Sequence, residues 1–527
     1  MISFGDYPYP SQRMPVLARN VVATSQPLAA QAGLRMLLQG GNAVDAAIAT
    51  AVSLTVVEPT SNGIGGDAFA LVWSDQKLHG LNGSGRSPKA WSFERFAGFD
   101  QMPKFGWDAV TVPGAVDAWV KLSQRFGKLP FIDLFTPAIE YAQNGFMVSP
   151  ITADRWALAA ELYREFPDFG RIFLPGGRAP RAGDLFICRN QARTLRMIAE
   201  SKGNSFYRGE LAEQIVDCAQ SNGGLMILKD LADHRSEWVT PISVKYRNVH
   251  MHEIPPNGQG LAALIALGIL NQFDLRQYPA DSADSIHLQI EAMKIAFAEA
   301  YRHIADVRSM EVNPEEFLTT AILTRRAGEI SMTQASHPES ILPTDHGTVY
   351  LTAADESGMM ISFIQSNYLG FGSGIVIPNT GIAMQNRGCG FVLDKDHPNC
   401  VAGGKRPFQT IIPGFVTRDN RALISFGVMG GNMQPQGHVQ MMVRMFDYNQ
   451  NPQSACDAPR WRIDEDFNVA VEPGFSELVI SDLKKRGHAI IEDATIFHYG
   501  GAQAIHCLPC GYCAASDPRK DGQAVGY

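Results

Sequence analysis

A change of residue pattern at Gly347-Thr-Val-Tyr-Leu-Thr-Ala-Ala354 decides the fold prediction. Residues 336–347 before it are mostly polar and include two prolines, which is typical of an exposed loop. From Thr348 onward the residues are β-branched and aromatic, and residues 359–365 repeat that composition after a short polar turn. The pattern predicts a β-hairpin whose first strand starts at Thr348, where a loop ends.

Helices and further strands are predicted on both sides of this hairpin. The apolar run 43–57 follows Asn42, a good N-cap, and ends before Pro59, which predicts a buried helix. It contains Asp45 and is too short to cross a bilayer. The longest helical periodicity covers residues 282–304. Other helix-like stretches are 27–39, 116–125, 132–144 and 211–221, and strand-like runs are 381–384, 410–416 and 422–428.

The overall composition is that of a globular protein. Hydrophobic residues make up 45% and charged residues 19%, so the chain can bury a sizeable core and lacks the bias of a disordered protein. A net charge of −8 and a pI near 5.9 argue against nucleic acid or an anionic membrane as partner. The first residues have prolines and polar side chains in place of the apolar core of a secretory signal, so we expect a cytoplasmic protein.

The eight cysteines are expected to be free thiols, because no secretory signal is predicted. Only Cys507, Cys510 and Cys513 are grouped, and His506 precedes them. Their spacing is compatible with zinc or part of an iron–sulfur cluster. A structural zinc site usually draws on a second ligand pair, and the sequence has no partner CxxC. We therefore predict no metal and no cofactor, with a metal at these cysteines as the alternative.

Nine short motifs then suggest a family. In order they are Gly40-Gly-Asn-Ala-Val-Asp-Ala-Ala, Glu58-Pro-Thr-Ser-Asn-Gly-Ile-Gly-Gly-Asp67, Val112-Pro-Gly-Ala115, Pro255-Pro-Asn-Gly-Gln-Gly260, Gly347-Thr-Val-Tyr-Leu-Thr352, Phe371-Gly-Ser-Gly-Ile-Val376, Lys405-Arg-Pro407, Met429-Gly-Gly431 and Asp457-Ala-Pro-Arg-Trp461. Each motif alone is weak. Together, in this order and spacing, they resemble the γ-glutamyltransferases, which are N-terminal-nucleophile hydrolases.

The resemblance implies an α+β fold, a four-layer αββα sandwich, and a chain that cuts itself. Thr348 would attack the carbonyl of Gly347, giving a large chain 1–347 and a small chain 348–527 that stay together as one structural domain. The partners expected are therefore the two fragments as an αβ heterodimer, with a dimer of heterodimers as an open alternative. The freed α-amine of Thr348 would act as the base and its hydroxyl as the nucleophile. Backbone N–H groups of Gly430 and Gly431 would stabilise the oxyanion.

The sequence departs from the family where the substrate's glutamyl group would bind. Cys389 and Gly390 stand where the family has carboxylates, and Arg387 stands where it has glutamine. Residues 408–410 read Phe-Gln-Thr in place of leucine and two serines. Losing carboxylates and gaining a guanidinium favours an anion over an ammonium group. The candidate substrate-binding residues are Arg86, which lies near but not at the position of the family's carboxylate-binding arginine, and Asn367, Arg387, Gln409 and Thr410.

These departures favour a small amide that carries a carboxylate and lacks an α-ammonium group. Oxamate is such a molecule, and one branch of the family hydrolyses it to oxalate and ammonia. The alternative enzyme is a glutathione hydrolase, γ-glutamyltransferase or acylase that acts on γ-glutamyl or other acyl amides. The alternative outside enzymology is an uncleaved binding or scaffold protein.

Overall fold

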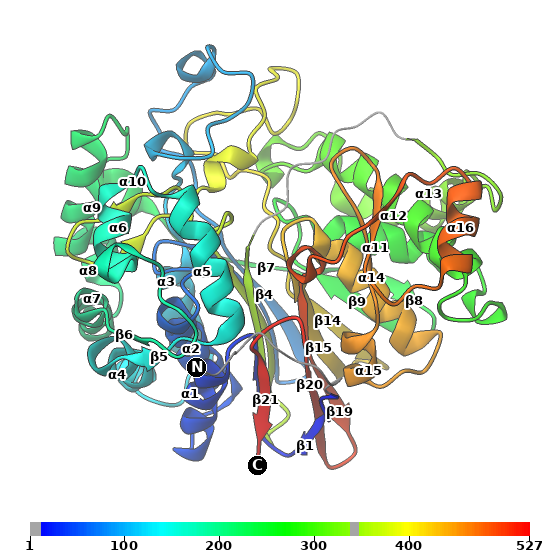
Figure 1. Ribbon diagram of the computed structural model, residues 1–527, viewed down its shortest axis with the longest axis horizontal. Helices are drawn as coiled ribbons and strands as arrows, with labels where there is room; N and C mark the ends of the chain where they lie inside the picture. The colour runs from blue at the N-terminus through cyan, green and yellow to red at the C-terminus, as the bar shows by residue number, and fades with distance from the viewer. Residues whose placement is uncertain (1–11, 338–346) are drawn as a thin grey trace.

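Two β-sheets lie face to face in the computed structural model, which describes residues 12–337 and 347–527 (Figure 1). Within these ranges each sheet has seven strands, and all neighbouring pairs in the two sheets are antiparallel. The first sheet has the order β21 (Gln523–Gly526), β2 (Val21–Thr24), β10 (Val349–Ala354), β11 (Met360–Ser366), β3 (Asp67–Ser74), β4 (Lys77–Gly83) and β7 (Glu237–Val239). The second has the order β1 (Val16–Ala18), β20 (Gly511–Ser516), β19 (Gly501–Leu508), β15 (Arg421–Met429), β14 (Gly414–Arg418), β9 (Val249–Glu253) and β8 (Ile242–Tyr246).

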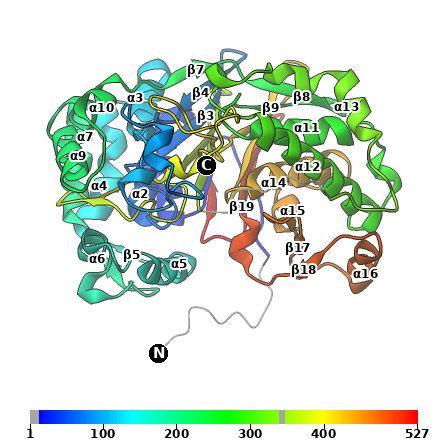
Figure 2. The same ribbon diagram turned by 90° about the horizontal axis from the view of Figure 1, so that it is seen from above.

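Helices cover the outer face of each sheet (Figures 1 and 2). The first sheet's side holds α1 (Pro27–Leu38), α2 (Ala43–Val57), α3 (Ala115–Phe126), α4 (Thr136–Asn144), α5 (Pro150–Leu162), α6 (Pro167–Phe173), α7 (Arg189–Ser201), α8 (Asn204–Arg208), α9 (Glu210–Ser221) and α10 (Leu228–Asp233). The second sheet's side holds α11 (Gly260–Leu270), α12 (Ala283–His303), α13 (Thr320–Ala327), α14 (Met433–Phe446), α15 (Pro452–Asp457) and α16 (Glu477–Lys485). The predicted four-layer αββα architecture is confirmed.

Helix α2 is the central helix of the first outer layer, and all of its residues are buried. It packs on α1, α4 and the strands β10 and β11. Asn42 caps it by accepting hydrogen bonds from the N–H groups of Val44 and Asp45, and the Asp45 carboxylate accepts from the N–H of Asn42. The apolar run thus predicted this element to the residue. No helix in the described ranges is long and apolar enough to cross a membrane.

The predicted hairpin is formed by β10 and β11, in the middle of the first sheet. Val349 pairs with Gln365 at its open end, and β2 pairs with the other edge of β10. Side chains between the two sheets, among them Tyr350, Ile364 and Phe415, form an apolar layer. Because β10 is hydrogen-bonded on both edges and packed on both faces, Thr348, which directly precedes it, is held at the end of a central strand.

Most predicted elements, including the short strand predicted for 381–384, are found within two residues of the predicted bounds, and two start about one turn or strand segment later. The strand predicted for 410–416 starts only at Gly414, because side-chain amides bond the preceding backbone: Gln259 bonds the carbonyl of Thr410 and Gln434 bonds the N–H of Ile412. The strand predicted for 381–384 is the two-residue β13 (Ile382–Ala383), paired with β12 (Val376–Ile377). The helix predicted for 132–144 starts with a 3-10 turn at Phe131–Phe135 before α4.

The remaining strands are short. They are β5 (Phe146–Met147) paired with β6 (Leu185–Phe186), and β16 (Trp461–Ile463), β17 (Val469–Val471) and β18 (Ile490–Glu492), which form a small sheet. Most of the loop predicted before Thr348, residues 338–346, lies outside the described residues.

Candidate active site

Thr348 is buried, with 1% of its surface exposed, and its hydroxyl lies in a short chain of hydrogen bonds. Thr348 Oγ1 donates to Ser366 Oγ at 3.2 Å, and Ser366 Oγ donates to the carbonyl oxygen of Gly347 at 3.0 Å. The N–H of Tyr368 donates to Ser366 Oγ at 2.7 Å, which fixes that hydroxyl. Ser366 is the last residue of β11, so the hairpin itself brings the two hydroxyls together.

Gly430 and Gly431 form the turn between β15 and α14, and both have positive φ, +121° and +55°. A Cβ on Gly430 would meet the Cα of Gly500 at 3.0 Å, so glycine fits this turn best. Their carbonyls accept hydrogen bonds from the N–H groups of Met433 (2.9 Å) and Gln434 (3.3 Å), whereas the described hydrogen bonds use neither glycine N–H. Gly430 lines the same cavity as Thr348. Both N–H groups are therefore unengaged within the described residues, and Gly430 shares a cavity wall with Thr348.

Arg387 lies in a buried polar cluster next to this turn. One terminal nitrogen donates to Thr410 Oγ1 at 2.7 Å, and the guanidinium lies 4.7 Å from the centre of the Tyr368 ring. Within the described residues, its other terminal nitrogen and its Nε have no hydrogen-bond partner, although the side chain is 1% exposed. Burial lowers the pKa of Arg387 to about 10, against the effect of nearby Asp67, so the group stays cationic at neutral pH.

Gln409 and Asn367 complete the cluster and offer acceptors. Gln409 Nε2 donates to Asp67 Oδ2 at 3.0 Å, while Gln409 Oε1 has no partner among the described residues. Asn367 Oδ1 has none either, and its backbone carbonyl accepts from the N–H of Asn386, the neighbour of Arg387. Burial raises the pKa of Asp67 to about 6, with Arg387 the largest opposing influence. The cluster thus combines a cation with unpaired donors and unpaired acceptors.

Two glutamines connect this cluster to the threonine. Gln259 Nε2 donates to the carbonyl of Thr410 at 2.6 Å and to that of Gly431 at 2.9 Å. Gln434 Oε1 accepts from the N–H of Ile412, and its Nε2 lies 3.5 Å from Thr348 Oγ1. The structure therefore brings together Arg387, Gln409 and Thr410 of the five predicted pocket residues near the glycine turn, and Asn367 is linked to them through the backbone bond to Asn386.

Arg86, the fifth, takes part in a different network. Its guanidinium forms ion pairs with Asp306 at 2.6 Å and with Glu237 at 3.0 Å. Asp306 also pairs with Arg308. No described contact joins Arg86 to Arg387 or Thr348, so the structure does not place it with the other candidates.

A cavity of about 280 Å³ opens beside Thr348. Its wall includes Gly347, Thr348, Gly430, side chains of α5, and the segment before β19, as well as Arg155 and Lys520. Sequence reasoning missed these two cations because neither lies in a recognisable motif and they are far apart in the chain. It also passed over Asp67 and Gln259, although both stand inside quoted motifs, and over Ser366 and Gln434.

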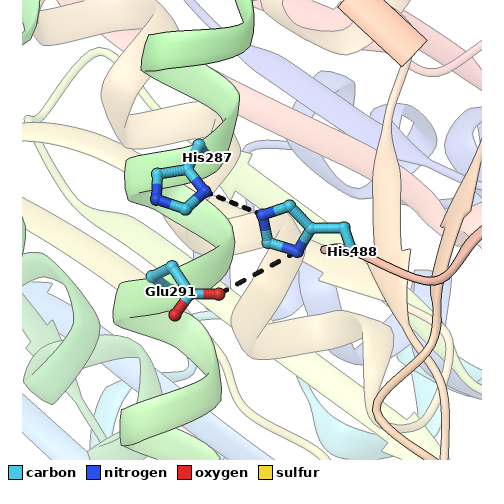
Figure 3. A group of neighbouring side chains, drawn as sticks. All are labelled: His287, Glu291 and His488. Atoms are coloured by element: carbon cyan, nitrogen blue, oxygen red, sulfur yellow. Dashed lines mark hydrogen bonds and ion pairs between the residues drawn. The ribbon is translucent and has the colours of Figure 1, made fainter. Parts of the chain in front are cut away.

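His287, Glu291 and His488 form the one group in the described residues whose ligand atoms are close enough for a metal (Figure 3). His287 Nε2 donates to the carbonyl of Ser331, so its Nδ1 accepts from His488 Nε2 at 2.8 Å. Lys294 Nζ lies 3.4 Å from His488 Nδ1 and 3.0 Å from Glu291 Oε1. The Lys294 ammonium thus pairs with Glu291 and lies beside His488, so two of the three candidate ligands already have a cationic neighbour, and the contact between the two imidazoles is satisfied with both rings neutral.

The C-terminal cysteines do not converge in the described structure. His506 pairs with Cys513 across β19 and β20, and Cys507 pairs with Tyr512, so Cys507 and Cys513 point to opposite faces of the sheet. Cys510 is exposed in the turn between the strands. This geometry does not support the alternative of a metal held by these three thiols.

The four-layer fold defines the class of N-terminal-nucleophile hydrolases. The chain belongs to the γ-glutamyltranspeptidase family, because the family model described as Gamma-glutamyltranspeptidase matches residues 29–527. It is therefore an amidohydrolase of the N-terminal-nucleophile type, and the predicted family is confirmed.

Three relatives illustrate the range of this family. The chain is 36% identical to the glutathione hydrolase-like YwrD proenzyme of Bacillus subtilis (96% of this chain, 98% of that protein). It is 35% identical to the oxamate amidohydrolase proenzyme of Klebsiella pneumoniae (95% and 97%). The crystal structure of cephalosporin acylase from Bacillus halodurans matches with a TM-score of 0.96 and 49% identity (100% and 99%).

Proposed function

We propose that the chain cleaves itself between Gly347 and Thr348. Thr348 Oγ attacks the carbonyl carbon of Gly347, the Gly347–Thr348 C–N bond breaks, and the amine takes up a proton, leaving an ester. Water then opens the ester, giving chains 1–347 and 348–527. The hydrogen bond from Ser366 to the Gly347 carbonyl supports this proposal, because it draws electron density from the carbon under attack. Both chains contribute strands to each sheet, so they stay together as one domain.

The freed Thr348 is the proposed nucleophile for amide substrates. Its α-amine has an ordinary pKa of about 7.7 to 8.0, so part of it is a free base near neutral pH beside its own hydroxyl. The unused N–H groups of Gly430 and Gly431 are the proposed oxyanion donors. The substrate's C–N bond breaks, the amine leaves with the proton, and water hydrolyses the acyl-threonine.

The substrate that the buried cluster supports best is an amide whose acyl part carries a carboxylate and no α-ammonium. Arg387 is the observation that carries this proposal, since a buried guanidinium with two unpaired nitrogens is suited to a carboxylate. Asp67 is the acidic partner of the cluster and is already bonded by Gln409 and by the N–H groups of Gly85 and Gly114. Oxamate is the smallest such substrate, and the Klebsiella pneumoniae relative bears its name.

A second candidate is an acylase that releases a larger amine. The cavity beside Thr348 favours it, because ammonia from oxamate would not fill about 280 Å³. The likeness to the Bacillus halodurans cephalosporin acylase supports the same candidate. A glutathione hydrolase would need a site for an α-ammonium, which the cluster supports less well.

The test combines a gel and a substrate series. Purified wild type should show two bands on denaturing electrophoresis, and Thr348→Ala one. Cleaved enzyme is then given oxamate, with ammonia measured, and glutaryl and γ-glutamyl 4-nitroanilides, with nitroaniline measured. We expect turnover of oxamate or the glutaryl amide and little of the γ-glutamyl amide. A preference for the γ-glutamyl amide would refute the substrate proposal, and an active but uncleaved wild type would refute the mechanism.

A further inference from the structure

We propose that the cavity beside Thr348 binds the amine portion of the substrate, and that Arg155 and Lys520 recognise a carboxylate on that portion. The inference rests on the proposed hydrolysis at Thr348 and adds a substrate class to it. The class is N-acyl amines whose amine portion is itself an acid, such as an N-acyl aminobenzoate or an N-acyl amino acid.

Thr348 is approached from two different sides. The cluster around Arg387 reaches the threonine by way of Gln259 and Gln434, and its members do not line the cavity. The cavity reaches the threonine from Gly347, Gly370 and Gly430. An amide carbon under attack has an acyl substituent and an amine substituent. If the acyl carboxylate lies at Arg387, the cavity is the space left for the amine portion.

Lys520 lines the cavity with an incompletely satisfied charge. It is 3% exposed, and its nearest acidic partner is Glu58, with Nζ 4.0 Å from Oε1. No acceptor in the described ranges lies within hydrogen-bond distance of Nζ. The other oxygen of Glu58 accepts from Ser25 at 2.5 Å, and Glu58 is not part of the cavity wall. The Lys520 ammonium therefore lines the cavity with Glu58 only at 4.0 Å, and a carboxylate in the cavity could approach it more closely.

Two more donors lie in the same wall. Arg155, on α5, donates from one terminal nitrogen to the carbonyl of Phe497 at 3.3 Å and lies over the Phe497 ring at 4.6 Å, while its Nε has no described partner. Thr60 Oγ1 is buried and also has none. Thr60, Arg155 and Lys520, from three different parts of the chain, therefore line one cavity, and two cations and a hydroxyl are a donor set that suits a carboxylate.

The remaining wall is largely apolar. Leu158, Ala159 and Leu162 of α5 form one side, and Met429 and Phe497 lie on others. The volume is close to the lower end of ligand pockets, about 300 Å³. This wall suits an amine portion with a ring or hydrocarbon body that ends in an anion.

The test uses matched anilides that differ only in one carboxylate. Oxanilate is compared with its 3- and 4-carboxy derivatives, and glutaranilate with the same derivatives, by measuring release of aniline or aminobenzoate. Wild type should favour a carboxylated member at least tenfold in kcat/KM. Lys520→Met and Arg155→Met should each lower this preference about tenfold, and Lys520→Arg should retain most of it. Arg164→Met, at an exposed arginine just beyond α5, is the matched control and should leave it unchanged.

The readout is the ratio of kcat/KM for a carboxylated anilide to kcat/KM for the plain anilide, measured in one enzyme preparation. Partial misfolding of a variant lowers both values equally and does not alter this ratio. Equal kcat/KM values in wild type for the carboxylated and plain anilides would overturn the inference. A ratio that is unchanged in Lys520→Met and Arg155→Met would overturn it as well. Release of ammonia from oxamate without release of any aniline would overturn it too, while leaving the proposed function intact. Absence of self-cleavage would instead count against the proposed function itself.

Discussion

The hydroxyl of Ser366 lies between the hydroxyl of Thr348 and the carbonyl it is proposed to attack. It accepts from Thr348 Oγ1 at 3.2 Å and donates to the oxygen of Gly347 at 3.0 Å. Before cleavage the amine of Thr348 is part of a peptide bond and cannot act as a base. Ser366 is placed to relay the proton: it can take the proton of the attacking hydroxyl while passing its own proton to the carbonyl oxygen, which leaves Ser366 neutral and the developing charge neutralised.

Ser366→Ala should therefore slow self-cleavage. Removing one donor to a developing oxyanion typically costs about 100- to 1000-fold in rate, and we expect the lower end because the Tyr368 N–H stays nearby. The measurement is the time course of the 348–527 fragment on denaturing gels after expression of the uncleaved chain. Ser366→Thr keeps the hydroxyl and is the control. Cleavage of Ser366→Ala at the wild-type rate would exclude this role.

Arg387→Gln should reduce hydrolysis of oxamate. Loss of a buried charge partner costs about 2 to 5 kcal/mol, which predicts a fall in kcat/KM of at least about 30-fold, mainly through KM. Arg86→Gln is the comparison, and we expect less than about a threefold change because the Arg86 guanidinium is engaged by Asp306 and Glu237. If Arg86→Gln were the more damaging of the two, the assignment of the anion site would be wrong.

Gln259→Leu should weaken both stability and catalysis. The Gln259 amide bonds two buried carbonyls, those of Thr410 and Gly431, and leaving each unsatisfied costs about 1 to 3 kcal/mol. The free energy of unfolding in urea should fall accordingly. Because the glycine turn loses a support, kcat should fall more than KM rises. Normal kcat in a destabilised Gln259→Leu enzyme would show that the turn does not depend on this bond.

The preference for carboxylated anilides should depend on pH. Burial and the neighbouring Arg155 lower the pKa of Lys520 to about 8, so its ammonium is present below that pH and is lost as the pH rises through it. The tenfold preference should therefore shrink above about pH 8. Glu58, Arg155, Asp517 and Asp521 also act on Lys520, and His498 lines the same cavity.

Lys520→Arg provides the control for this pH dependence, because arginine stays charged throughout the range. Its preference should be constant from pH 7 to about 9. If the preference for carboxylated anilides declined with pH equally in wild type and in Lys520→Arg, the titrating group would be another one, such as the α-amine of Thr348.

Lys294→Met should be strongly destabilising, whereas a chelator should not. The substitution leaves Glu291 buried with its ion pair broken, which typically costs about 3 to 5 kcal/mol. Prolonged dialysis against EDTA should leave the thermal midpoint unchanged, because Lys294 already pairs with Glu291, one of the three groups that a metal would need. A lower midpoint after EDTA, restored by zinc, would mean that His287, Glu291 and His488 bind a metal.

Much of the fold could be predicted from local sequence. Asn42 and the apolar run after it specify α2, since capping and burial act within one segment. The β-branched residues from Thr348 specify β10 in the same way. The strand predicted for 410–416 was wrong at its start because distant side chains, Gln259 and Gln434, take the hydrogen bonds that a strand neighbour would have taken.

The sequence by itself determined the family, the scissile pair Gly347–Thr348 as a candidate, and the loss of acidic groups at Cys389 and Gly390 together with the gain of Arg387, because each is a property of residues close together in the chain. Only the tertiary structure decided that Ser366 is hydrogen-bonded to both the hydroxyl of Thr348 and the carbonyl of Gly347. The same holds for the placement of Arg86 in another network and for the cavity that Arg155 and Lys520 share with Thr348. These relationships join residues far apart in sequence, and their distances are set by how the two sheets and their helices pack.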